Sequence, residues 1–386
     1  MSVAEFDDIR PYDDEEVGRV VEELIADRAF KPIVKMAFPE LTFREIKKKM
    51  LGCKTKRDFQ ENFSCPFLWK IARNCTDGLT LDHSAVEDKT KAYTYVSNHR
   101  DIVLDAAFLS ILLMKEGMDS VENAVGNNLI ISPWIMNVMK LNKSFIVRRS
   151  LNLREVKPEA ERLSRYIHHT ITDKKQSVWI AHREGRAKDA DDRTQESVLK
   201  MLAMGGKGDV IDRLMALNIV PMSISYEYDP CDHLKAQEIQ FVRDIPNYKK
   251  FFMNDVNSMV AGIVGYKGHV HIQMAPCLND ELAALDRSLP KTELYRQIAQ
   301  LIDRHIHRNY RMYPCNYMAH DMLLNKETYP FHYNKEDEYG FDWYIDNQIE
   351  KLFMPSKDAP FLRETMLQMY TNLLKNHQAA WEEDGE

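Results

Sequence analysis

The sequence lacks the markers of several large protein classes. No apolar run reaches the roughly 18 residues that a membrane-spanning helix needs. The longest runs, IVLDAAFLSILLM and LIISPWIMNVM, are interrupted by polar residues or proline. Basic residues are not in excess, because the formal net charge is -7 at pH 7. We therefore expect neither an integral membrane protein nor a protein that binds nucleic acid through its overall charge.

The cysteines form no recognisable framework either. All six stand alone in the sequence, without a Cys-x-x-Cys pair. The N-terminal stretch MSVAEFDDIRPYDDEE is acidic and has none of the features of a signal peptide. We therefore expect reduced thiols in a cytoplasmic protein, with no structural zinc and no disulfide set.

Hydrophobic periodicity divides the chain into three parts. Residues 1–90 show mostly helical spacing, and Thr42, Glu45 and Gly52 predict the capping box and the end of one helix. From residue 91, the β-rich runs AYTYVSN, KSFIVRRS, SVWIAH, IVPMSISYEY and HVHIQM mostly alternate with helix-like segments. We predict a helical N-terminal domain over 1–90, an α/β domain over 91–280 and a helical C-terminal extension over 281–386. The predicted α/β fold has a mixed, largely parallel sheet flanked by helices.

Candidate catalytic chemistry is concentrated in YTYVSNHRDIVLDAAFLSILL, residues 93–113. His99 lies between a strand-like and a helix-like run and is followed by Asp101 and Asp105. Protein kinases also contain an HRD tripeptide, but Ala106 stands where their catalytic loop needs asparagine. The chain also has no DFG motif and no GxGxxG before the tripeptide. We reject a kinase and interpret His99 as a general base with Asp105 as its partner, because Asp101 comes too early in the loop.

Two further segments carry groups suited to a phosphate. FIVRRS supplies Arg148 and Arg149, whose guanidinium groups bind phosphate bidentately. Successive residues on a strand point to opposite faces, so we expect only one of them to reach a ligand. In HREGRAKD, Gly185 lets the backbone approach a ligand, and Glu184 and Arg186 flank it.

A fourth segment, VPMSISYEY, is a β-rich run opened by proline that could line an acyl channel. In this order, the four segments resemble the four sequence blocks of the glycerolipid acyltransferase superfamily, which includes the glycerol-3-phosphate and 1-acylglycerol-3-phosphate acyltransferases. The matching stretches are NHRDIVLD, FIVRR, EGR and IVPMSI, within residues 80–230. Two spacings depart from the family pattern. Asp105 follows His99 by six residues instead of five, and Gly185 directly precedes Arg186.

The resemblance implies an acyltransferase of phospholipid biosynthesis. Such an enzyme moves a fatty acyl group from a thioester, on acyl carrier protein or coenzyme A, to the hydroxyl of a glycerol-phosphate-type or lysolipid acceptor. His99 and Asp105 would be catalytic. The residues implied to bind the substrate phosphate are Arg148, Arg149, Glu184, Gly185 and Arg186. The reaction needs no metal and no cofactor beyond the acyl donor. We expect a peripheral protein at the inner face of the membrane. A non-catalytic lipid- or carrier-protein-binding module and a thioester hydrolase remain open as alternatives.

Two other segments have two interpretations each. His269 and His271 lie on one face of a predicted strand and could bind a metal, but no third ligand is evident, so we assign no metal site. NNLIISPWIMNVMKL, residues 127–141, is interpreted as core. A patch that dips into the membrane interface or lines the acyl pocket is the alternative.

Overall fold

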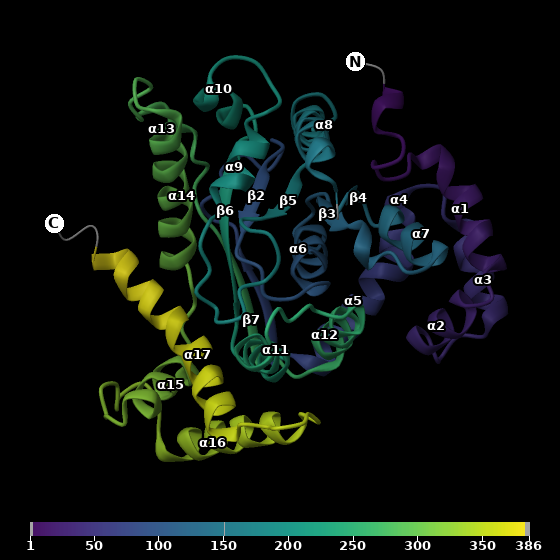
Figure 1. Ribbon diagram of the computed structural model, residues 1–386. Coiled ribbons are helices and arrows are strands. Elements are labelled where there is room, and N and C mark those ends of the chain that lie inside the picture. Colours follow the sequence, from purple (N-terminus) through teal and green to yellow (C-terminus); the bar gives the residue numbers. More distant parts are fainter. Residues whose placement is uncertain (1–2, 150, 383–386) are drawn as a thin grey trace.

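The computed structural model describes residues 3–149 and 151–382. At its centre lies a seven-stranded sheet in the order β1-β7-β6-β2-β5-β3-β4 (Figure 1). Five neighbouring strands, β6, β2, β5, β3 and β4, run parallel, whereas β7 is antiparallel to β6 and parallel to β1. The strands are β1 (Gly78–Asp82), β2 (Thr94–Ser97), β3 (Glu122–Gly126), β4 (Ser144–Val147), β5 (Val178–Ala181), β6 (Ile219–Tyr226) and β7 (His269–Met274). The predicted α/β class with a mixed, largely parallel sheet is confirmed.

The sequence indicates β2, β4, β5, β6 and β7 but neither β1 nor β3. β3 has the sequence ENAVG, in which glutamate, asparagine and glycine are all uncommon in strands. β1 begins with Gly78 and pairs with β7 at the edge of the sheet. The sheet therefore starts before residue 91, inside the part of the chain that we expected to be helical.

Most of the N-terminal helices lie beyond the β4 edge of the sheet (Figure 1), whereas the last of them, Cys65–Cys75, packs against β1 at the opposite edge. They are η1 (Val3–Phe6), α1 (Asp14–Ala26), α2 (Phe30–Ala37), α3 (Phe43–Gly52), α4 (Lys56–Phe59), the π-helical turn η2 (Gln60–Ser64) and α5 (Cys65–Cys75). The capping box predicted for α3 is present. The Glu45 backbone N–H donates to Thr42 Oγ1 at 3.3 Å, and the Glu45 carboxylate accepts from the Thr42 N–H at 2.7 Å. Side chains of α1, α2 and α3 form a small hydrophobic core together with Phe59, Phe63 and Leu141.

A second group of helices packs around the sheet. It comprises α6 (Leu104–Lys115), η3 (Asn127–Leu129), α7 (Pro133–Leu141), α8 (Leu153–Thr172), α9 (Glu196–Leu202), α10 (Val210–Met215), α11 (Asp232–Asp244), α12 (Phe252–Val264) and α13 (Asn279–Ala283). Among these helices, α6 begins directly after the His99 loop. Leu104, Phe108, Leu109 and Leu112 are all buried, as expected for a helix that is apolar on nearly every side. This packing fixes the start of α6, and with it Asp105, against the sheet.

Helices close the C-terminal part of the chain on the side of the sheet remote from the N-terminal helices (Figure 1). They are α14 (Lys291–Arg308), α15 (Pro314–Leu324), α16 (Lys335–Glu350) and α17 (Ala359–Glu382). One hydrophobic core includes Val96 and Phe145 of the sheet together with Ile302 and Leu362 of these helices. The C-terminal extension therefore shares a core with the sheet. None of the helices in the described ranges has an apolar stretch long enough to cross a membrane.

Candidate active site

The segments expected to carry chemistry meet at one edge of the sheet. β2, β5, β3 and β4 run parallel, so their carboxyl ends lie on the same side. His99 follows β2, the EGR segment 184–186 follows β5, and Arg148 and Arg149 follow β4. In open α/β sheets, ligands bind in the crevice outside the carboxyl ends of the strands.

Asn98 and Trp179 set the position of His99. The Asn98 amide Nδ2 donates to the Ile224 carbonyl at 2.9 Å, and the Ile224 N–H donates to Asn98 Oδ1 at 2.8 Å. This exchange continues the pairing of β2 with β6 by one residue. The Trp179 indole packs edge-on to the His99 ring, with the ring centroids 5.6 Å apart, and donates its N–H to Ser97 Oγ at 3.0 Å.

His99 and Asp105 form a hydrogen-bonded pair. His99 Nδ1 lies 2.8 Å from Asp105 Oδ2. The same carboxylate oxygen accepts the backbone N–H groups of Arg100 at 2.7 Å and Asp101 at 3.0 Å, and Oδ1 accepts the Tyr226 hydroxyl at 3.2 Å. The Asp105 side chain is fully buried, whereas the His99 side chain retains 15% exposure. With the Nδ1 proton donated to Asp105, Nε2 is left as the proton acceptor of the ring.

The six-residue spacing between histidine and aspartate is absorbed by a capped loop. Asp101 Oδ1 accepts the backbone N–H groups of Val103 and Leu104, each at 2.8 Å, and so caps the start of α6. Asp101 itself is buried against Gly262 of α12. Burial and then the charge of Asp105 raise the pKa of Asp101. Asp101 therefore accepts hydrogen bonds from the backbone at the start of α6, and Asp105 is the residue that contacts the imidazole.

The two arginines after β4 have different surroundings. Arg149 forms an ion pair with Glu184, which joins two of the predicted segments. Arg148 instead lies 3.4 Å from Asp8 and 3.1 Å from Glu159, which directs it towards the N-terminal segment and α8. Of the pair, Arg149 is the one that meets another predicted phosphate-binding residue.

The remaining residues of the EGR segment differ in exposure. Gly185 is exposed and has a φ of 67°, a left-handed conformation that favours glycine. Arg186 is buried. Burial lowers its pKa, but interactions with Cys231 and then with the charges of Asp101 and Asp229 raise it overall. Its NH1 atom has no hydrogen-bond partner among the described residues. Arg186 thus belongs to the buried surroundings of the His99 loop, not to the exposed pair of Arg149 and Glu184.

A network of buried charged side chains contacts the His99 loop. The sequence analysis did not predict it. Arg100 lies 3.1 Å from Asp229 and 3.7 Å from Asp192, and Lys235 pairs with Asp229 and donates to the Arg100 carbonyl at 3.3 Å. Burial alone would raise the pKa of Asp229, but Lys235 and Arg100 hold that pKa well below its ordinary value. All four side chains are almost completely buried.

The same network reaches the C-terminal helices. The Tyr370 hydroxyl on α17 donates to Asp232 Oδ2 at 2.8 Å and accepts the Asp229 backbone N–H at 3.1 Å. From α16, the Tyr344 hydroxyl and the Gln348 amide donate to Asp232, each at 2.7 Å. The C-terminal helices therefore help to place Asp229, and through it Arg100 and the loop.

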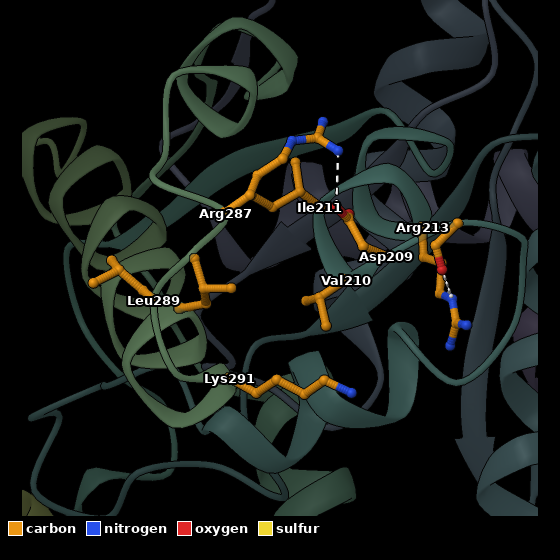
Figure 2. A pocket seen from close by; sticks show the side chains of 9 residues that line it. Asp209, Val210, Ile211, Arg213, Arg287, Leu289 and Lys291 are labelled. Carbon is orange, nitrogen blue, oxygen red and sulfur yellow. Dashed lines mark hydrogen bonds and ion pairs between the residues drawn. The ribbon is translucent and has the colours of Figure 1, made fainter.

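The cavity drawn in Figure 2 lies elsewhere. It has a volume of about 250 Å³ and is lined by residues of α10 and of the start of α14, among them Arg213, Arg287 and Lys291. In the chain, α10 leads into the start of β6 at Ile219, whereas His99 follows the opposite end of the neighbouring strand β2. This cavity is separate from the His99 site.

Comparison with known proteins gives distant matches among solved structures alone. No protein-family model matches the chain, and no curated protein has a matching sequence. Among solved structures, the chain is similar to the 1-acyl-sn-glycerophosphate (LPA) acyltransferase PlsC from Thermotoga maritima, with 11% identity and a TM-score of 0.35. The match covers 75% of this chain and 96% of that chain. A likeness this distant indicates nothing about the reaction of this chain.

Proposed function

We propose that the protein is an acyltransferase that moves a fatty acyl group from an acyl thioester to the hydroxyl of a glycerol-phosphate-type acceptor. The observation that supports this most is the contact between His99 and Asp105. A partly exposed imidazole is held through Nδ1 by a buried carboxylate that also accepts two backbone N–H groups. This arrangement fixes the ring tautomer and leaves Nε2 as a base.

In the proposed reaction, His99 Nε2 takes the proton of the acceptor hydroxyl while the hydroxyl oxygen attacks the thioester carbonyl carbon. The tetrahedral intermediate collapses, the carbon–sulfur bond breaks, and the thiolate leaves with the proton returned by the imidazolium. Asp105 stabilises that imidazolium and keeps the ring aimed. A base of this kind contributes about 10²–10⁴-fold to the rate. The donor is an acyl-coenzyme A or an acyl carrier protein, and no further cofactor takes part.

Arg149 is the residue we assign to the acceptor phosphate. Its side chain is 38% exposed and is held by Glu184 at the carboxyl edge of the sheet. A phosphate dianion would compete with the Glu184 carboxylate for the guanidinium, and Gly185 would allow close approach of the backbone. Arg148 is engaged by Asp8 and Glu159, so it is not part of this assignment.

Contact with a membrane surface is part of the proposal and is assigned to α12. Phe251 before this helix and Met253, Val260 and Val264 on it are 72%, 56%, 54% and 66% exposed. Gly262 on the same helix packs against Asp101 of the His99 loop. An apolar helix face next to the site would deliver lipid substrates from the interface. Co-flotation with phosphatidylglycerol vesicles, weakened in Val260→Asp, would support the assignment, and unchanged flotation would contradict it.

The catalytic proposal is tested by mass spectrometry of the acylated product. Purified protein is incubated with palmitoyl-coenzyme A or palmitoyl carrier protein and with glycerol-3-phosphate or lysophosphatidate as acceptor. His99→Ala should lower the rate of ester formation by about 10²–10⁴-fold. The matched control is His169→Ala, since His169 Nδ1 makes a similar contact of 2.7 Å with Asp173 on the surface of α8. It should act like the wild type.

Each other outcome identifies an alternative. Thiol release without any acceptor would indicate a thioester hydrolase. Binding of lipid or carrier protein without turnover would indicate a non-catalytic module. Wild-type activity in His99→Ala would show that the imidazole is not the base of the reaction.

The phosphate assignment is tested by a pair of neighbouring variants. Arg149→Ala should raise the KM for a phosphate-containing acceptor by about 10-fold or more, as loss of a charge-assisted hydrogen bond of about 1.5–3 kcal/mol implies. It should leave the KM of the thioester donor unchanged. Arg148→Ala, which removes the same charge one residue away, should change neither value. Equal effects of the two variants would contradict the assignment.

A further inference from the structure

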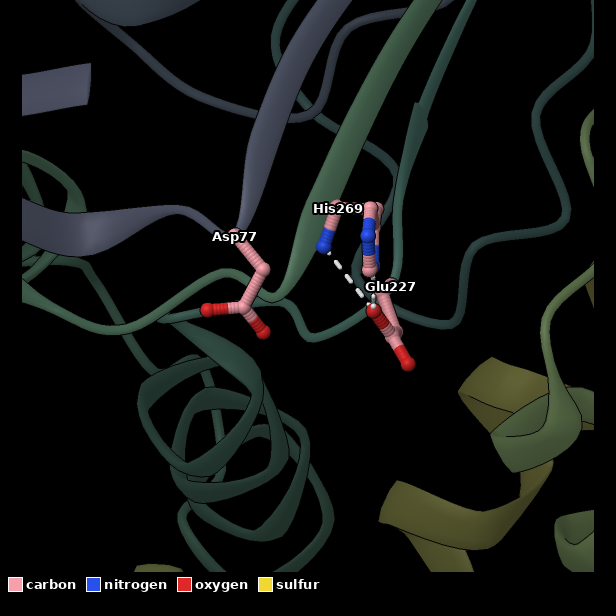
Figure 3. Close-up of side chains that lie close together, drawn as sticks. All are labelled: Asp77, Glu227 and His269. Atoms are coloured by element: carbon pink, nitrogen blue, oxygen red, sulfur yellow. Dashed lines mark hydrogen bonds and ion pairs between the residues drawn. The ribbon is translucent and has the colours of Figure 1, made fainter. Parts of the chain in front are cut away.

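Three side chains with metal-binding atoms converge where β6 ends and β1 and β7 begin, further along the sheet edge that carries the His99 loop (Figure 3). Asp77 precedes β1, Glu227 follows β6, and His269 begins β7. Strand register brings them together, because Gly78 pairs with His269 and Tyr226 pairs with Val270. One ligand atom from each of the three side chains lies within 4.8 Å of the other two.

The charges around this cluster are unbalanced. Asp77 and Glu227 bring two carboxylates together, and among the described residues no lysine or arginine forms an ion pair with either. Their contacts are instead with neutral donors and with one imidazole. The Tyr266 hydroxyl donates to Asp77, the His269 backbone N–H donates to Glu227 at 2.8 Å, and His269 Nδ1 lies 2.9 Å from the same Glu227 oxygen. A cation would offset the repulsion between the carboxylates.

Only one histidine of the HVH motif takes part. His271 Nδ1 is engaged by Thr80 Oγ1 at 2.8 Å, and its ring is not among the three converging groups. From the sequence, the two histidines of one strand were the candidate ligands and no third ligand was evident. In the structure, His269 is joined instead by two carboxylates that are distant in the sequence, Asp77 and Glu227. His271 is therefore the natural control for His269.

The cluster also has room for a hydrated ion. Asp77 and His269 are exposed, which leaves space for water ligands on the outer side. Gly268, with a φ of 58°, passes so close to Glu227 that a Cβ there would collide with the carboxylate. Glycine thus allows the carboxylate to lie flat against the backbone beside His269.

We propose that Asp77, Glu227 and His269 bind one divalent cation, of the class represented by Mn²⁺ or Zn²⁺. One imidazole nitrogen and two carboxylate oxygens suit these ions, which bind such ligands at about 2.0–2.2 Å. The three ligand atoms already lie within 4.8 Å of one another, so small side-chain movements would bring all three to such distances from one ion. Bound there, the ion joins the start of β1, the end of β6 and the start of β7 and stabilises this edge of the sheet.

Binding is tested with Mn²⁺ on the full-length protein after treatment with EDTA. Mn²⁺ is the better probe because the six free cysteines could bind Zn²⁺ elsewhere. Titration calorimetry should give one equivalent bound. His269→Ala and Glu227→Gln should each weaken binding by more than about 100-fold, because loss of an outer-shell partner alone costs about 10–100-fold. His271→Ala should bind like the wild type.

Thermal unfolding gives an independent measurement. Mn²⁺ at 100 times its dissociation constant should raise the ratio of folded to unfolded wild type by about 100-fold and so raise the melting temperature. The increase should be lost in His269→Ala and in Asp77→Asn and kept in His271→Ala. No binding at millimolar Mn²⁺, equal binding by His269→Ala, or equal loss in His271→Ala would overturn the proposal. His99→Ala should still bind Mn²⁺, so the outcome does not depend on the proposed acyl transfer.

Discussion

Tyr226 donates its hydroxyl hydrogen to Asp105 Oδ1 at 3.2 Å, while His99 uses the other oxygen of the same carboxylate. The two contacts come from neighbouring parallel strands, since Tyr226 lies at the end of β6 and His99 follows β2. Burial and then the Asp105 charge raise the pKa of Tyr226 well above its ordinary value. The hydroxyl therefore stays protonated and remains a donor throughout the neutral pH range.

Tyr226→Phe should lower kcat and leave the KM of the acceptor unchanged. The variant removes one hydrogen bond to a charged group, worth about 1.5–3 kcal/mol, so about a 10–100-fold decrease is expected if the whole effect falls on the transition state. The acidic limb of the pH profile of kcat/KM should move as well, because Asp105 would be held differently. Tyr228→Phe is the control, since no hydrogen bond joins the Tyr228 hydroxyl to another described residue. A changed KM with normal kcat would instead indicate a merely structural role.

The packing of α12 against the His99 loop leads to a second prediction. Gly262 lies so close to the Asp101 carboxylate that an added Cβ would collide with it, and Asp101 caps α6 directly before Asp105. Gly262→Ala should therefore displace the loop and lower both kcat and the free energy of unfolding, the latter by about 1–3 kcal/mol. Gly18→Ala is the matched control, because nothing lies within 4 Å of a Cβ there and α1 should gain up to about 1 kcal/mol. Urea unfolding and the acyl-transfer assay measure both effects, and equal behaviour of the two variants would contradict the role of α12.

The parts of the site that are close together in the chain could be predicted from the sequence. The contact between His99 and Asp105 followed from a short motif, and Asp101 was set aside because it comes too early in the loop. Alternation along a strand indicated that only one of Arg148 and Arg149 would reach a ligand, but could not say which. β4 ends at Val147, and the partners Asp8 and Glu184 lie far from both arginines in the sequence.

The supporting residues were beyond the reach of local patterns. Tyr226, Trp179 and Tyr370 come from distant strands and helices, and each has an ordinary interpretation as core. The charges of Arg100 and Asp229 gave no signal that they would be buried together, because burial of charge depends on packing that only the complete fold determines. The same holds for β1 and β3, whose composition is unfavourable for strands and whose pairing depends on their neighbours.

The hydrogen bonds of Tyr370 connect the C-terminal helices to the loop and give a third prediction. Tyr370→Phe leaves the buried Asp229 N–H without its acceptor and takes one donor from Asp232. The free energy of unfolding should fall by about 1–3 kcal/mol, the cost of leaving a buried polar group unsatisfied. Tyr339→Phe on α16 removes a hydroxyl from a side chain that is 79% exposed and should change stability by less than about 0.5 kcal/mol. The urea midpoints of the two variants and the wild type measure these changes. An unchanged midpoint in Tyr370→Phe would contradict the role given to α17.

Asp192 gives the protein a defined sensitivity to acid. It is fully buried, and although burial alone would raise its pKa, the His182 imidazole 3.6 Å away and the charge of Arg100 lower that pKa to about 2 from an ordinary 3.8. A carboxylate whose pKa is lower in the folded state contributes stability above the pKa of the unfolded state and loses it as the pH falls through the folded value. The contribution of Asp192 should therefore be complete above about pH 4 and should disappear towards about pH 2, a change of about 2 kcal/mol.

The comparison of wild type with Asp192→Asn isolates this contribution. Urea unfolding between pH 2 and pH 5 should give a steeper fall in the free energy of unfolding for the wild type than for the variant. The variant should be less stable at pH 5, because Arg100 loses one of its two carboxylate neighbours, and the two proteins should converge as the pH approaches about 2. Parallel pH dependences would mean that the pKa of Asp192 is the same in the folded and unfolded states. The charge of Asp192 would then not stabilise the buried network.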